Sequence, residues 1–192
     1  METQFFNVDP RLGAVSDRAE AAAKEAFAAI DRITEFNQQK VLSAYIRHRV
    51  SETHFNPTTG YGYGDQGRDA LDEILADIMG AEDALIRHSI VSGTHAITIA
   101  LFGILRPGDT LLAATGAPYD TLEKVIGHTS PSAGSLAEYG VSYEQVDLLP
   151  DGSMNVEEII RRLKENPAIR LIEIQRSRGY DWRDSMSIEQ IK

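Results

Sequence analysis

The segment Ser92-Gly93-Thr94 combines a glycine with two hydroxyl side chains at the predicted start of a helix. Free backbone amides and the positive end of the helix dipole make such a start attractive to a phosphate or a carboxylate, and Gly93 allows a close approach. Serine and threonine also favour this position simply as helix caps. The pattern therefore leaves two readings open, an anion site and an ordinary cap, and it matches neither a Walker A loop nor a dinucleotide loop.

Glycines and tyrosines alternate in the segment 60–64, GYGYG, which lies in a stretch without helical or strand periodicity. We predict that residues 51–67 form an aromatic loop. The phenols of Tyr61 and Tyr63, with Arg68 five residues beyond the second, are good donors to phosphate or carboxylate groups. The tyrosines could equally pack at a contact between subunits.

Tyr119 follows a predicted strand and begins a predicted helix, at the carboxyl edge of the sheet, where open α/β folds bind their ligands. A tyrosine that only covers the core is the alternative. Further along, Arg176, Arg178 and Arg183 follow another strand. Their guanidinium groups are suited to clamping a substrate carboxylate, or they form a solvated patch of ion pairs with neighbouring aspartates.

Other kinds of chemistry find little support in the sequence. The five histidines have no metal-binding spacing, there is no cysteine, and no G-x-S-x-G motif occurs. We therefore expect neither a metal site nor a thiol or serine nucleophile of these types.

The elements that must position these residues alternate between short apolar strands and amphipathic helices, which is typical of an α/β fold with a mainly parallel sheet. Before them, an alanine-rich stretch from Ser16 to about Val50 predicts two helices, or one that bends near Asn37, with Ser16 as the cap. The predicted strands are 84–87, 110–114, 141–146 and 170–174, and the later helices are 71–79, 92–105, 119–126, 156–164 and a short one after Ser187.

Size and charge limit the classes of partner. The 192 residues suit one or at most two domains, and the formal net charge is −10 without a cluster of basic residues. Nucleic acid and anionic membranes are therefore poor partners. No apolar run approaches the ~20 residues of a membrane-spanning helix, and the first residues do not look like a signal peptide. We expect a cytoplasmic protein.

Taken in order, the blocks GYGYGD, SGTHA, GAPYDT and QRSRGY closely resemble the aluminium-resistance proteins, also called methionine gamma-lyase-like or cystathionine beta-lyase-like proteins. The resemblance extends from about Phe36 to the last residue. These proteins belong to the fold-type I pyridoxal-phosphate enzymes. The resemblance implies an aspartate aminotransferase-like fold with helices on both faces of the sheet. It also implies that residues 1–55 form a helical amino-terminal segment and residues 56–192 an incomplete large domain.

The resemblance also implies roles for individual residues. Ser92, Gly93 and Thr94 look like the turn that holds the cofactor phosphate, and Tyr119 is similar to the aromatic residue that stacks on the pyridine ring. Tyr61 and Tyr63 correspond to a segment that, in the related lyases, reaches the cofactor phosphate of a neighbouring subunit through a Tyr-x-Arg motif. The arginine of that motif is missing here, and Arg68 is considered as its substitute. Arg176, Ser177 and Arg178 correspond to residues near the substrate.

In this family the Schiff-base lysine lies on a later strand, so we expect it beyond Lys192 and no catalytic residue in the present chain. The implied parent is a homodimeric or homotetrameric pyridoxal 5'-phosphate-dependent carbon-sulfur lyase acting on a small sulfur amino acid, of which this is an inactive amino-terminal part. Two alternatives stay open. One is a non-catalytic α/β binding or scaffold module, and the other is an enzyme that binds a different phosphorylated ligand, such as a nucleotide, at Gly93 and Thr94.

Overall fold

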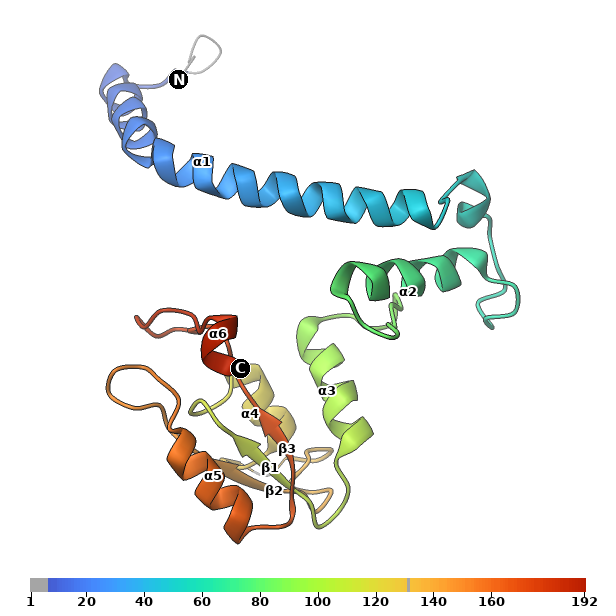
Figure 1. Cartoon of the computed structure of the whole chain (residues 1–192), viewed down its shortest axis with the longest axis vertical. Helices are drawn as coiled ribbons and strands as arrows, with labels where there is room; N and C mark the ends of the chain where they lie inside the picture. Colours follow the sequence, from blue (N-terminus) through green and yellow to red (C-terminus); the bar gives the residue numbers. More distant parts are fainter. Residues whose placement is uncertain (1–6, 131) are drawn as a thin grey trace. The chain divides into compact units, whose positions relative to one another are not determined.

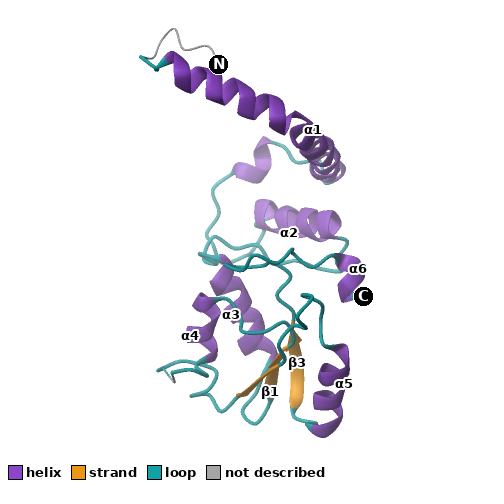
Figure 2. Ribbon diagram, turned by 90° about the vertical axis from the view of Figure 1, so that its left-hand side faces the viewer, coloured by secondary structure: helices purple, strands orange, loops and turns teal. Residues whose placement is uncertain are grey.

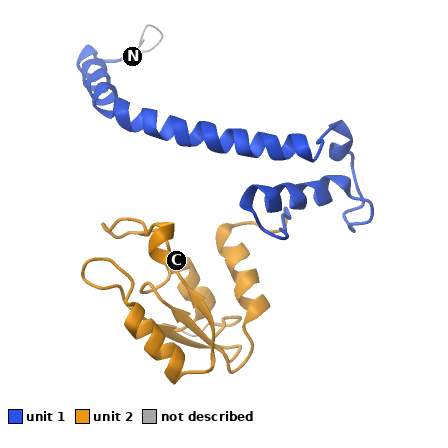
Figure 3. Cartoon of the chain, viewed as in Figure 1, with its two compact units in different colours: residues 1–88 blue, residues 89–192 orange. Residues whose placement is uncertain are grey.

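The computed structural model describes residues 7–130 and 132–192. The chain forms two compact units, residues 1–88 and residues 89–192 (Figure 3). The predicted domain boundary between residues 55 and 56 falls inside the first unit and stays a prediction.

The first unit begins with one long helix, α1 (Pro10–Arg47), which changes direction in its amino-terminal part (Figure 1). Asp9 caps it by accepting a hydrogen bond from the amide of Arg11 at 2.9 Å. The prediction that Ser16 is the cap is wrong, because Asp9 followed by a proline at the first helical position starts the helix earlier. The helix also continues through Asn37, whose side-chain amide donates to the carbonyl of Ile33 at 2.8 Å.

The remainder of the first unit is a short 3-10 helix, η1 (Glu52–Phe55), and helix α2 (Gln66–Met79). The predicted loop therefore contains one helical turn. Helix α2 ends at Gly80 with a φ of 66°, as its sequence predicts. The predicted strand 84–87 is wrong: its Ile86 amide donates to the Asp72 carboxylate at 2.7 Å, so it is not available to a sheet.

The second unit is an α/β layer structure, which confirms the predicted α/β class with a parallel sheet; the finer assignment to the aspartate aminotransferase-like fold stays a prediction. Strands β1 (Thr110–Ala113), β2 (Ser142–Gln145) and β3 (Ile169–Glu173) form a parallel sheet in the order β2-β1-β3. Helices α3 (Gly93–Ile104) and α4 (Asp120–Ile126) cover one face, and α5 (Val156–Glu165) covers the other (Figure 2). The short helix α6 (Ile188–Ile191) follows, with Ser187 as its predicted cap.

The core of this unit lies between the sheet and the pair α3 and α4. Leu111 in the central strand is fully buried, and the register places it between Tyr143 of β2 and Leu171 of β3. Leu101 and Leu122, from α3 and α4, belong to the same buried cluster. Burial of such side chains is the main source of the stability of this unit. The central strand is thereby fixed, and so is the loop that leaves its carboxyl end.

In the described part of the chain, no helix combines the length and apolar character needed to cross a membrane.

Candidate functional site

The amino terminus of α3 presents unused hydrogen-bond donors. Ser92 caps the helix by accepting from the amide of His95 at 3.1 Å, and its carbonyl accepts from Ala96. Within the described residues, the amides of Gly93 and Thr94 have no acceptor. A Cβ added to Gly93 would meet no atom within 4 Å, so the space beside this residue is open. This is the arrangement that a phosphate group needs.

A contact between two hydroxyl groups joins this helix start to the next one. The hydroxyl of Thr94 lies 3.0 Å from that of Thr121, in the first turn of α4. Tyr119 is the N-cap residue of that same helix. The structure thus brings the predicted phosphate turn and the predicted ring-stacking tyrosine to one place, and Thr121, which the sequence analysis did not single out, is the residue that links them.

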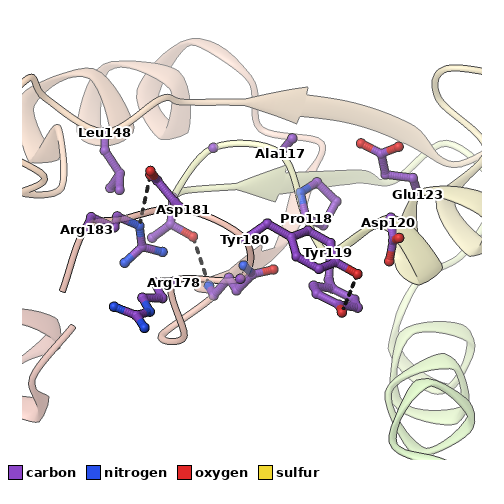
Figure 4. A pocket seen from close by; sticks show the side chains of 14 residues that line it. Ala117, Pro118, Tyr119, Asp120, Glu123, Leu148, Arg178, Tyr180, Asp181 and Arg183 are labelled. Atoms are coloured by element: carbon purple, nitrogen blue, oxygen red, sulfur yellow. Dashed lines mark hydrogen bonds and ion pairs between the residues drawn. The ribbon is translucent and has the colours of Figure 1, made fainter. Parts of the chain in front are cut away.

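A cleft of about 430 Å³ opens at the carboxyl edge of the sheet, beside Tyr119 (Figure 4). Two hydrogen bonds shape it. The amide of Gln175 donates to the hydroxyl of buried Thr115 at 2.9 Å, and the amide of Gly116 donates to the carbonyl of Val146 at 2.9 Å. The cleft is lined by residues that follow β1, β2 and β3, among them Pro118, Tyr119, Leu148, Arg178 and Tyr180.

The ring of Tyr180 lies on that of Tyr119 in this cleft (Figure 4). The ring centroids are 5.3 Å apart, the planes differ by 26°, and the hydroxyl of Tyr119 donates to that of Tyr180 at 2.8 Å. The two phenols share this proton, which, together with the nearby Asp120 carboxylate, raises the pKa of Tyr180 above its usual value. Tyr180 belongs to the block QRSRGY but was not predicted as a site residue.

The loop that carries Tyr180 is closed at its base. The amide of Met186 donates to the carbonyl of Arg176 at 3.0 Å, and the guanidinium of Arg176 donates back to the carbonyl of Met186 at 2.8 Å. Arg183 donates to the carbonyls of Ser177 and Asp184 at 2.8 and 3.0 Å. Two of the arginines considered for a substrate clamp therefore stabilise the loop itself.

The predicted substrate-binding group is divided by this arrangement. Arg178 lines the cleft, whereas Arg176 and Ser177 do not. The guanidinium of Arg178 has no hydrogen bond or ion pair to any described residue, and it points away from the two tyrosine rings (Figure 4). Arg178 is thus the arginine of this group that is available to a ligand.

Tyr61 and Tyr63 belong to the first unit and are 83% and 89% exposed. Their predicted contact with a neighbouring subunit's phosphate stays a prediction. Arg68, considered as the donor that replaces the missing arginine, lies in the first turn of α2 and binds residues of the preceding loop. It donates to the carbonyl of Gly60 at 3.1 Å and lies 3.3 Å from the Asp65 carboxylate.

A buried polar group lies on the face of the sheet that carries α3 and α4. Glu173, the last residue of β3, has one carboxylate oxygen without a hydrogen bond among the described atoms, and burial raises its pKa. Tyr143 stacks on His128 with a centroid distance of 4.1 Å. Burial, then the charges of Glu173 and two other acids, raise the pKa of Tyr143 to about 12.

No lysine lines the cleft in the described structure. The five lysines of the chain lie elsewhere: two on α1, one each on α4 and α5, and one at position 192. The described residues also contain no group of three or more side chains suited to hold a metal ion.

Comparison with known proteins places this geometry in a family. Residues 13–192 match the methionine gamma-lyase family, so the chain belongs to that family. A solved carbon-sulfur lyase involved in aluminium resistance from Clostridium novyi is 49% identical with a TM-score of 0.87, covering 96% of this chain and 44% of that one. A candidate cystathionine beta-lyase involved in aluminium resistance from Clostridium acetobutylicum is 46% identical with a TM-score of 0.87, and the coverage is the same.

Among curated proteins, YnbB of Bacillus subtilis is 51% identical over 164 residues, which are 85% of this chain and 38% of that protein. The chain therefore spans less than half the length of the relatives it matches. These comparisons confirm the resemblance at the level of the lyase family.

Proposed function

We propose that this chain supplies the phosphate and ring contacts for pyridoxal 5'-phosphate in a carbon-sulfur lyase of fold type I. The observation that carries the proposal is the contact between Thr94 and Thr121, which places an open helix amino terminus beside Tyr119. The names of the relatives from Clostridium, which refer to a carbon-sulfur lyase and a cystathionine beta-lyase, support the reaction class.

The residues present fit the phosphate and the ring of this cofactor. The free amides of Gly93 and Thr94 suit the phosphate, whose negative charge the α3 dipole stabilises. Tyr119 is 38% exposed and offers an aromatic surface within the cleft. When bound, pyridoxal phosphate draws electrons away from the α-carbon of an amino acid, which elimination of a sulfur group requires.

The remaining residues of the cleft have roles in binding. Arg178, whose guanidinium has no partner among the described residues, is suited to hold the carboxylate of a small sulfur amino acid in the cleft. We assign the cofactor-binding lysine to the part of the relatives' length that this chain does not cover. Homodimeric or homotetrameric assembly and a cytoplasmic location belong to the same proposal. The exposed apolar side chains of α1, such as Phe27 and Ile30, support assembly, because contact of apolar surface with water is unfavourable and a second subunit would cover it.

The experiment compares binding of pyridoxine 5'-phosphate, which has no aldehyde to react with lysines, with binding of inorganic phosphate by calorimetry. We expect the 192-residue chain to bind pyridoxine phosphate more tightly, and Tyr119→Ala to remove that difference. Equal affinity for the two ligands would contradict the ring site and favour another phosphorylated ligand.

A second measurement tests the absence of the cofactor-binding lysine. The chain is mixed with pyridoxal phosphate, reduced with borohydride and mapped by peptide mass spectrometry. We expect no preferential pyridoxyl label on any of the five lysines. Stoichiometric label on a single lysine, lost in Tyr119→Ala, would overturn this part of the proposal.

A further inference from the structure

One face of the Tyr119 ring is already in contact with an aromatic ring of the same chain. The Tyr180 ring lies at an offset-stacking distance, and the two hydroxyls share a hydrogen bond. We propose that Tyr180 is a specificity-determining residue of this site, because its ring competes for Tyr119 with the aromatic ring of the ligand. The proposal rests on the proposed function, which assigns Tyr119 to the pyridine ring.

The loop around Tyr180 is built so that its tip can move while its base stays fixed. The base is closed by the paired hydrogen bonds between Arg176 and Met186 and braced by Arg183. The tip has few contacts: Tyr180 is 79% exposed and Trp182 is 93% exposed. Displacement of Tyr180 therefore costs the ring stack and one hydrogen bond, and the loop base can remain intact.

Gly179 brings the tip close to Tyr119. Its φ is 59°, a conformation that other residues adopt at a cost, and a Cβ added there would lie 3.9 Å from the Tyr119 ring. The backbone thus passes directly beside the ring before it places Tyr180 on it.

This competition selects among ligands. A ligand with both a phosphate and an aromatic ring gains the Tyr119 surface when it displaces Tyr180, whereas inorganic phosphate binds at the start of α3 without touching either ring. A stack of two aromatic rings corresponds to a factor of about 2 to 12 in an equilibrium constant. Removing Tyr180 should therefore strengthen binding of the ring-containing ligand alone.

Calorimetry on the 192-residue chain tests this with two probes, pyridoxine 5'-phosphate and inorganic phosphate. We expect Tyr180→Ala to bind pyridoxine phosphate up to about tenfold more tightly, Tyr180→Phe to show a smaller gain, and both to bind inorganic phosphate as the wild type does. Trp182→Ala is the matched control, because it removes an exposed aromatic residue from the same loop, and its affinities should not change.

The fluorescence of Trp182 gives an independent readout, since this is the only tryptophan in the sequence and lies two residues from Tyr180. Pyridoxine phosphate should change its emission in the wild type and inorganic phosphate should not.

The outcomes separate this inference from the proposed function. If Tyr119→Ala weakens pyridoxine phosphate binding but Tyr180→Ala leaves it equal or weaker, the inference is wrong and the proposed ring site stands. If Tyr180→Ala increases the affinity for both probes equally, the residue only narrows the cleft and the inference is wrong. If Tyr119→Ala binds pyridoxine phosphate as the wild type does, the ring site itself is wrong, and the inference fails with it.

Discussion

The hydroxyl of Thr94 lies 3.0 Å from the hydroxyl of Thr121, so that side chains join the first turns of two helices 27 residues apart in the sequence. The two helices cover the same face of the sheet (Figure 2). Because each hydroxyl can donate or accept, the pair holds the helix starts together and still offers a proton to an anion.

Thr94→Val should weaken the binding of pyridoxine phosphate and of inorganic phosphate alike. Valine keeps the shape but removes a donor to a charged group, and such hydrogen bonds contribute about 1.5–3 kcal/mol. We expect a loss of about tenfold or more in calorimetric affinity. Thr98→Val is the control, because that hydroxyl donates to the carbonyl of Thr94 inside α3, 2.7 Å away. Equal losses in the two variants would mean that helix stability is responsible.

Gly67→Ala should destabilise the first unit. An added Cβ would lie 2.2 Å from the carbonyl oxygen of His54, which is backbone and cannot rotate away. We expect a loss of about 1–3 kcal/mol in the free energy of unfolding, measured by chemical denaturation. Gly13→Ala is the matched control: it lies in α1 with no atom near its Cβ position, and alanine there should stabilise the helix. Unchanged stability in Gly67→Ala would contradict the close contact between η1 and α2.

The second unit should lose stability at high pH because of Tyr143. A phenol in the unfolded chain ionises near pH 10, whereas burial, followed by nearby acids, raises the pKa of Tyr143 to about 12 in the folded protein. The unfolded state therefore loses its proton first, so stability is constant below pH 10 and falls as the pH rises towards about 12.

Absorbance titration of the seven tyrosines checks this directly. The phenol of Tyr143 should ionise late in the wild type, in addition to that of Tyr180, whose pKa is also raised. Tyr143→Phe should remove one of these late ionisations and flatten the loss of stability. A titration that is the same in both proteins would show that the ring is solvated.

Arg183→Met should loosen the loop that carries Tyr180. The arginine donates to two backbone carbonyls of that loop, and methionine retains the apolar stem without the donors. Chymotrypsin should then cleave after Tyr180 or Trp182 several-fold faster. Arg178→Met serves as the control, because Arg178 makes no such bonds. Equal rates for the two variants would contradict the bracing role of Arg183.

The elements of the second unit were largely predictable, because their signals are local. Ser92 before an apolar periodic stretch predicted α3, and the buried run of β1 lies between a turn and a glycine. The start of α1 was missed for an equally local reason. Both Asp9-Pro10 and Ser16 carry cap signals, and only the earlier one is used, since nothing between them interrupts a helix.

The pairing of Tyr119 with Tyr180 could not be predicted in the same way, since 61 residues separate them. Their contact depends on the order of the strands, which places the loops after β1 and β3 side by side. The different roles of Arg176, Arg178 and Arg183 likewise follow from the closed base of the loop. Their spacing in the sequence predicted the same role for all three arginines.

The position of β1 has a consequence for hydrogen exchange. Its four residues are buried and paired on both sides, so their amides should exchange only when the whole unit unfolds. Tyr119 lies six residues after the end of this strand. A ligand that binds only the folded unit stabilises it by mass action. Ligand binding in the cleft should therefore slow deuterium uptake at Leu111 and Leu112. Both residues are fully buried in the sheet, so hydrogen exchange would detect binding at positions that have no contact with solvent.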